Sequence, residues 1–244
     1  MKKIGIIIAF LGVVLIVFGI GVFTFSDKNS DKKENEKIVK ERLSSADYDL
    51  FYSNIQTAAS YFDIYFVSRY DNFKVNSLNN EEKTQFILNI LSNYQSPVVT
   101  EELVISESSK YFSTFNLYKN SIYSGSNKIL YQYQDGKFTY LSSESQNYIV
   151  NSELISNDGY TDSWVLKKKI YFIKTTYNDN KYRNSVYKSI DDLKKGKEIY
   201  SFVTDVPASQ VDDYKKIRKK INTYVYTFKR VQNQYFLDSV KMED

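Results

Sequence analysis

The first apolar pattern along the chain is an uninterrupted hydrophobic run. It extends from Ile4 to Phe25, 22 residues without a charged side chain. At about 1.5 Å per residue, a helix of this length spans roughly 33 Å, which matches a bilayer core of about 30 Å. Cleaved signal peptides have a shorter apolar stretch and a small-residue cleavage site, which Thr24 and Ser26 imitate poorly. We therefore predict that residues 1–25 form a cytoplasmic stub and a retained single-pass transmembrane anchor.

One side of the predicted anchor carries small residues. Gly5, Gly12 and Gly19 recur every seven residues, and Ala9 follows Gly5 by four. These four positions lie within about 80° of one another around a helix. Such a stripe lets a second helix approach closely, which predicts a homodimer formed through the anchor. The alternative is that these glycines only reflect the general frequency of glycine in membrane helices.

Polar residues dominate from residue 26 to residue 46, which we predict to be a charged spacer because it has almost no apolar side chain with which to build a core. Lys2 and Lys3 favour a cytoplasmic N-terminus and an extracytoplasmic C-terminal domain at the cell membrane. The spacer itself carries more basic residues than the N-terminal flank, which argues for the opposite orientation. We keep the first orientation because long domains translocate largely regardless of charge.

The hydrophobic period becomes helical after the spacer. Between Asp47 and Arg69, apolar residues recur three and four positions apart, the pattern of an amphipathic helix: Phe51, Ile55, Ala58, Phe62 and Tyr65. A second helix is predicted from Asn79, whose side chain can cap it while Glu82 reaches back to the Asn79 backbone. Its buried face is formed by Phe86, Ile87, Ile90, Leu91 and Tyr94.

After the second helix, the spacing of apolar residues changes from the 3.6-residue period of a helix to the two-residue period of a strand. Asp135-Gly136 is a strong signal for a two-residue type I′ turn, which would pair Tyr133 with Phe138 and Tyr131 with Tyr140 on one face of a hairpin. Further strands are predicted over residues 164–177, 185–189, 197–203, 224–231 and 235–240. A helix is predicted after Ser209, with Asp212 at its third position and an inner stripe of Tyr214, Ile217, Ile221 and Tyr224.

This order of elements predicts an α+β domain over residues 47–244, with an antiparallel, aromatic-rich sheet. The order is similar to that of small NTF2-like extracytoplasmic domains, in which helices wrap a cone-shaped sheet. The domain could consist of two lobes, 47–150 and 151–244, because Asn157-Asp158-Gly159 suggests a break near their boundary.

The amino-acid composition limits the kinds of catalytic and binding site that the chain can form. His and Cys are both absent, which excludes serine–histidine triads, thiolate nucleophiles, disulfides and sulfur metal sites. No glycine-rich phosphate loop is present, and we expect no cofactor. The abundance of Tyr, Phe, Lys and Asn with only 2 Pro indicates an AT-rich bacterial genome. A tyrosine-rich surface that stacks on sugar rings is the functional alternative for the 23 Tyr.

Charge is concentrated in one part of the chain. The whole chain is +4, which is too balanced to predict nucleic-acid binding, whereas residues 165–220 carry fifteen basic and seven acidic side chains. The inner stripe of the helix after Ser209 would display Lys215, Lys216 and Lys219 together on the opposite side. These lysines form either an ordinary solvated face or a contact with an anionic partner, namely phospholipid, a phosphate-rich wall polymer or an acidic envelope protein.

These patterns favour a membrane-anchored, non-catalytic binding or assembly module of a bacterial cell envelope. The alternative is a cell-wall glycan hydrolase, because glycoside hydrolysis needs only two carboxylates about 5 to 9.5 Å apart. The adjacent pairs Asp191-Asp192 and Asp212-Asp213 are poor candidates for such a dyad, since adjacent side chains point to different sides of a strand or helix.

Overall fold

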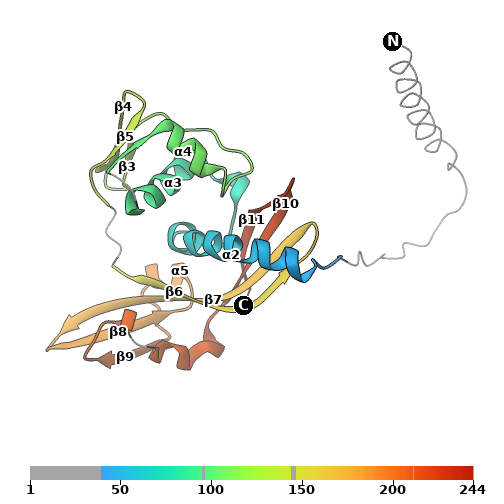
Figure 1. Cartoon of the computed structure of the whole chain (residues 1–244). Helices are drawn as coiled ribbons and strands as arrows, with labels where there is room; N and C mark the ends of the chain where they lie inside the picture. Colours follow the sequence, from blue (N-terminus) through green and yellow to red (C-terminus); the bar gives the residue numbers. More distant parts are fainter. Residues whose placement is uncertain (1–39, 95–96, 144–146, 211, 244) are drawn as a thin grey trace, which may run out of the picture. The chain divides into compact units, whose positions relative to one another are not determined.

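The computed structural model describes residues 40–94, 97–143, 147–210 and 212–243 (Figure 1). The chain from Lys40 onward forms one compact unit. The predicted anchor, with Gly5, Ala9, Gly12 and Gly19, and most of the predicted spacer lie outside the described residues. Within the described ranges, no helix has both the length and the apolar character needed to cross a membrane.

Two of the predicted helices are confirmed. Helix α2 (Ser45–Phe62) is capped by Ser44, whose side chain accepts a hydrogen bond from the Asp47 amide, and it continues into a π-helix, η1 (Asp63–Val67). Helix α3 (Asn80–Tyr94) begins with the predicted capping box. The Glu82 amide donates to Asn79 Oδ1 and the Asn79 amide donates to the Glu82 carboxylate, each at 2.9 Å. Two shorter helices, α4 (Glu101–Ser108) and α5 (Ile190–Lys194), are not anticipated by the sequence.

The strands form two antiparallel sheets. The larger sheet has seven strands. Six of them follow the order β1-β11-β10-β7-β8-β9, and the seventh, β6, also pairs with β7, along the edge opposite β10 and β8. Its strands are β1 (Phe73–Lys74), β6 (Ile149–Gly159), β7 (Ser163–Asn178), β8 (Lys181–Tyr187), β9 (Tyr200–Thr204), β10 (Thr223–Val231) and β11 (Gln234–Glu243). The smaller sheet has the order β2-β5-β4-β3. Its strands are β2 (Val98–Thr100), β3 (Ile122–Tyr123), β4 (Ile129–Gln134) and β5 (Lys137–Tyr140). The predicted α+β class with antiparallel, aromatic-rich sheets is therefore correct.

The register of the β4–β5 hairpin agrees with the sequence. Asp135 and Gly136 both have positive φ angles, 52° and 74°, as a type I′ turn requires. Tyr133 lies opposite Phe138 and Tyr131 lies opposite Tyr140. The ring centroids of these pairs are 4.8 and 5.5 Å apart, so the cross-strand aromatic contacts help to fix the register.

The larger of two hydrophobic clusters in the described residues joins the helices to both sheets, and α2 lies between the sheets in Figure 1. Phe62, Phe66 and Phe86 stack on one another in its centre, and such aromatic pairs contribute about 0.5–1.5 kcal/mol each beyond the area they bury. The suggested boundary between residues 150 and 151 falls inside β6, which also contains Asn157-Asp158-Gly159.

The helix predicted after Ser209 is wrong in type and extent. Residues Asp213–Lys220 form a 3₁₀-helix, η4, that is interrupted by non-helical angles at Ile217, and Tyr224 lies on β10 instead. In a 3₁₀-helix residues three apart lie on the same side, and the two buried residues of η4, Tyr214 and Ile217, have this spacing. The lysines at 215 and 216 each pair with an aspartate three residues earlier. Tyr214, Ile217 and Ile221 are buried as predicted.

Candidate functional site: a cationic pocket

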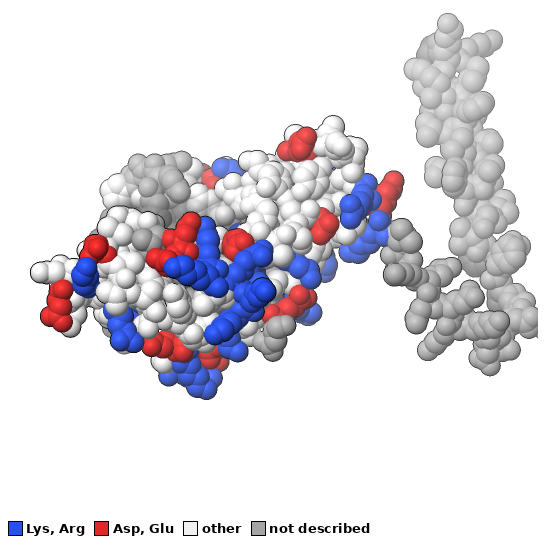
Figure 2. Space-filling model, turned by 90° about the horizontal axis from the view of Figure 1, so that it is seen from below, with Lys and Arg blue, Asp and Glu red and all other residues white. Residues whose placement is uncertain are grey.

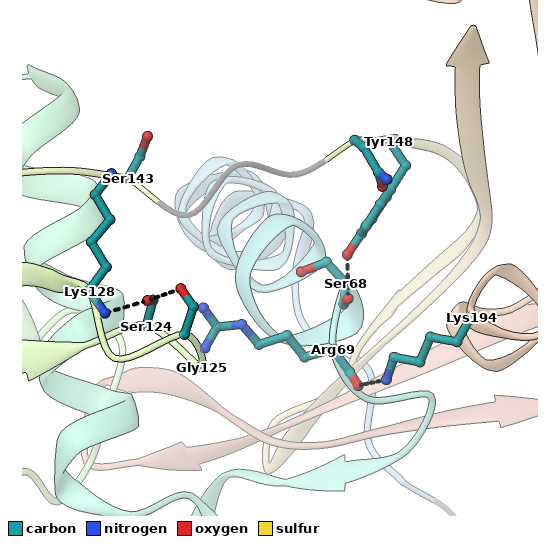
Figure 3. Close-up of a pocket in the computed structure, with 10 residues that line it drawn as sticks. Ser68, Arg69, Ser124, Gly125, Lys128, Ser143, Tyr148 and Lys194 are labelled. Atoms are coloured by element: carbon teal, nitrogen blue, oxygen red, sulfur yellow. Dashed lines mark hydrogen bonds between the residues drawn. The ribbon is translucent and has the colours of Figure 1, made fainter.

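An open pocket of about 740 Å³ lies where the end of the π-helix, the β3–β4 turn and helix α5 meet (Figure 3). We call it the cationic pocket, because its lining includes three basic side chains, four serines and no acidic side chain among the described residues. The lining residues are Ser68, Arg69, Ser124, Gly125, Ser126, Lys128, Ser143, Asn147, Tyr148 and Lys194. Its volume is within the usual range for ligand sites.

The backbone of Ser68 and Arg69 is the fixed side of the cationic pocket. These residues directly follow the π-helix, and π-helical turns are frequent at functional sites. The Tyr148 hydroxyl donates to the Ser68 carbonyl at 2.7 Å, and Lys194 Nζ donates to the Arg69 carbonyl at 3.3 Å. Lys194 is the last residue of α5, whose first amide, at Ile190, donates to Asp71 Oδ1. Helix α5 is therefore held against this loop at both ends.

The β3–β4 turn forms the opposite side. The Lys128 amide donates to Ser124 Oγ at 3.1 Å, and the Ser124 and Ser126 hydroxyls are 2.9 Å apart. A Cβ atom added to Gly125 would have no atom within 4 Å, which leaves the turn open toward solvent. In Figure 3 the Arg69 side chain extends toward this turn, with Lys128 and Ser143 on one side of the pocket and Tyr148 and Lys194 on the other.

The charge of the pocket is its most distinctive property. No carboxylate of the described residues forms an ion pair with Lys128 or Lys194, which we call the pocket lysines. Arg69 Nη1 contacts Gln85 Oε1 at 3.5 Å. Ammonium and guanidinium groups beside hydroxyls are the donors that bind phosphate and carboxylate groups. The arrangement can therefore hold an anion.

The lysines chosen from the sequence lie elsewhere. Lys215, Lys216 and Lys219, the helix lysines, are exposed on η4, as the sequence predicts. Lys215 pairs with Asp212 at 2.8 Å and Lys216 pairs with Asp213 at 2.5 Å. Each aspartate raises the pKa of its lysine through the hydrogen bond between them. Figure 2 shows one face of the molecule, on which acidic side chains lie beside basic ones. Sequence reasoning missed the pocket residues, because Arg69, Lys128 and Lys194 are far apart in the chain.

Lys168, in contrast to the pocket lysines and the helix lysines, is buried. Lys168 Nζ donates to Asp63 Oδ2 at 2.7 Å, and the exposed fractions of their side chains are only 3% and 5%. The Tyr226 hydroxyl donates to the other oxygen of Asp63, and burial raises the pKa of Tyr226 well above its usual value. These three side chains contact one another in the interior and do not line the cationic pocket, which indicates a structural role.

Carboxylates are scattered over the described surface. Asp49 and Asp158 line a hollow of about 260 Å³, where Arg42 lies 3.7 Å from Asp158. Asp191 contacts Lys195, and Asp212 and Asp213 contact the helix lysines. In the part of the chain that the structure describes, no three His, Cys, Asp or Glu side chains are grouped so that they could hold a metal ion. The chain matches no protein-family profile, no curated protein sequence and no solved structure.

Proposed function

We propose that the chain is a single-pass, membrane-anchored and non-catalytic binding module of a bacterial cell envelope. Its extracytoplasmic domain binds an anionic envelope polymer, and the cationic pocket holds one phosphate or carboxylate group of that polymer. The observation that carries this proposal is the pocket of about 740 Å³ with two lysines that have no carboxylate partner among the described residues.

The electrostatic argument favours the pocket over the helix lysines. A lysine that already contacts an aspartate gains less from an external anion, because that anion must compete with the existing carboxylate. The pocket lysines do not have this competitor within the described residues. Exposed ion pairs contribute up to about 1 kcal/mol each, so the two exposed pocket lysines support weak binding. Attachment to the membrane raises the effective concentration of the domain at its polymer and strengthens such binding.

The anchor belongs to the proposal as well. The 22-residue apolar run supports a retained transmembrane helix, and the stripe of Gly5, Ala9, Gly12 and Gly19 supports its self-association. Protease treatment of intact cells should cleave the C-terminal domain, and N-terminal sequencing should find Met1 or Lys2. A mature N-terminus near Ser26 would contradict the anchor, and a protected C-terminal domain would reverse the orientation. Gly12→Ile should weaken association in a membrane two-hybrid assay.

Binding is tested with the full-length chain in detergent and two preparations of cell-wall material, one that retains its anionic polymer and one from which the polymer has been extracted. We expect co-sedimentation only with the first preparation, and a decrease as salt screens the charges. Replacing both pocket lysines by Gln should lower the affinity about 10-fold, or roughly 1.4 kcal/mol.

The matched control is Lys74→Gln with Lys241→Gln, which removes the same charge from two exposed lysines outside the pockets described here. An equal loss in the control, or equal binding to both wall preparations, would overturn the proposed site. Binding to phosphatidylglycerol vesicles in place of wall polymer would overturn the proposed partner. Clearing of wall material in a zymogram would contradict a non-catalytic role and favour the hydrolase.

A further inference from the structure

A second, smaller pocket adjoins the cationic pocket. It has a volume of about 230 Å³ and lies between helix α3 and the β4–β5 hairpin. Arg69 and Ser143 line both pockets, so the two hollows lie next to each other. Its other lining is different in chemistry, because it contains aromatic rings and side-chain amides but no lysine. We call it the aromatic pocket.

Tyr140 supplies an accessible ring in the aromatic pocket. The residue is 36% exposed, and its hydroxyl has no hydrogen-bond partner among the described residues. The ring contacts that of Tyr131, which is buried and whose hydroxyl lies 2.7 Å from Asn89 Oδ1 and 3.0 Å from Ser92 Oγ. Tyr140 therefore rests on a neighbour whose position is fixed by hydrogen bonds, which holds the exposed ring in place for a ligand.

Two amides complete the polar part of this pocket. Asn89 Oδ1 accepts the Tyr131 hydroxyl, and Gln85 Oε1 accepts from Arg69. These contacts orient the amides and leave Asn89 Nδ2 and Gln85 Nε2 without an acceptor in the described part of the chain. Ligand sites typically combine an apolar or aromatic surface with a few placed polar groups of this kind.

We infer that the aromatic pocket takes a sugar ring whose charged substituent lies in the cationic pocket, so that the ligand is an anionic saccharide. This inference rests on the proposed function and specifies its ligand. A pyranose ring presents C–H groups on one face, which stack on an aromatic ring, and hydroxyl groups at its rim, which accept from amide N–H groups. Because Arg69 and Ser143 border both pockets, a single residue of such a polymer can reach both.

The test compares three small probes on the full-length chain in detergent by calorimetry: inorganic phosphate, N-acetylglucosamine and N-acetylglucosamine 1-phosphate. The sugar phosphate should bind at least about 10-fold more tightly than phosphate, a difference of roughly 1.4 kcal/mol. Tyr140→Ala should abolish this difference and leave phosphate affinity unchanged, and Tyr140→Phe should retain most of it. Tyr177→Ala is the matched control, because Tyr177 is an exposed tyrosine that lines neither pocket.

The outcomes separate this inference from the proposed function. If phosphate and sugar phosphate bind equally, or if Tyr140→Ala weakens both alike without lowering the melting temperature, the sugar site is wrong while the anion site stands. If neither charged probe binds and wall polymer also fails to bind, the proposed function falls with the inference. Replacing the pocket lysines by Gln should weaken both charged probes, and loss of only one of them would contradict the shared site.

Discussion

The pocket lysines and the helix lysines lie in the same domain, and both groups are exposed, yet they differ in their surroundings. Lys215 and Lys216 each have an aspartate three residues earlier, within 2.8 Å. Lys128 and Lys194 have no carboxylate partner among the described residues, and both line the cationic pocket, one on each side of the Arg69 side chain (Figure 3). The number of basic residues in a segment therefore does not show which of them lack an acidic neighbour. Whether an acid lies beside each of the described lysines depends on the tertiary structure.

The largest effect is expected at the lysine that is paired and also removed from water. Lys168→Ala leaves Asp63 as an uncompensated buried charge, which should lower the free energy of unfolding by about 3–5 kcal/mol. Replacing the pair together, with Asp63→Asn and Lys168→Met, should recover most of this loss. Denaturant unfolding of the full-length chain in detergent measures both. A loss below about 1 kcal/mol in the single variant would show that burial does not amplify the pairing.

Removing the aspartates of η4 should make the helix lysines more similar to the pocket lysines. Asp212→Asn with Asp213→Asn leaves the helix lysines without these partners, and the affinity for wall polymer should rise about threefold, or roughly 0.6 kcal/mol. Glu81→Gln with Glu102→Gln gives the same change in net charge from two acids without an ion pair in the described residues. An equal rise in this control would mean that net charge alone determines binding.

Neutralising the helix lysines should have a smaller effect than neutralising the pocket lysines. Lys215→Gln, Lys216→Gln and Lys219→Gln together should lower polymer affinity less than twofold, because exposed ion pairs already hold two of them. Stability should change by less than about 1 kcal/mol. Co-sedimentation and thermal melting measure these two quantities. A 10-fold loss of affinity here would restore η4 as the binding surface.

The smallest effect is expected from pH. The hydrogen bond from Lys215 holds the pKa of Asp212 below its usual value of 3.8, and the chain has no His. The stabilising effect of a carboxylate with a depressed pKa is lost only as the pH falls through that depressed value. The Asp212–Lys215 pair should therefore persist from pH 5 to pH 8. The ratio of the wild-type affinity for wall polymer to that of the pocket-lysine variant should also stay constant over this range. A ratio that changes within this range would indicate a titrating group in the site.

Local sequence signals predict the parts of the fold that depend on neighbouring residues. The Asn79–Glu82 capping box, the Asp135-Gly136 turn and the alternation of β10 and β11 are all read correctly, because the interacting residues are close in sequence. Helix α4 is only eight residues long, which is too short for a clear hydrophobic period. The apolar residues at 214, 217 and 221 are spaced by three and four, which does not distinguish an α-helix from the 3₁₀-helix η4.

The cationic pocket could not be predicted in the same way. Arg69 follows a π-helix, Lys128 ends a turn and Lys194 ends α5, and no spacing in the sequence connects these three positions. Their meeting depends on how α5 and the smaller sheet pack beside the end of the π-helix. The charge count over residues 165–220 includes Lys194 but assigns it no special role, because each lysine counts equally in a linear window.

The most direct test of the central claim is lysine footprinting. The full-length chain in detergent is acetylated with and without bound wall polymer, and mass spectrometry measures the reactivity of each lysine. The account predicts that Lys128 and Lys194 are protected by the polymer, whereas Lys215, Lys216 and Lys219 react equally in both samples. Protection of the helix lysines with unchanged reactivity at Lys128 and Lys194 would contradict it.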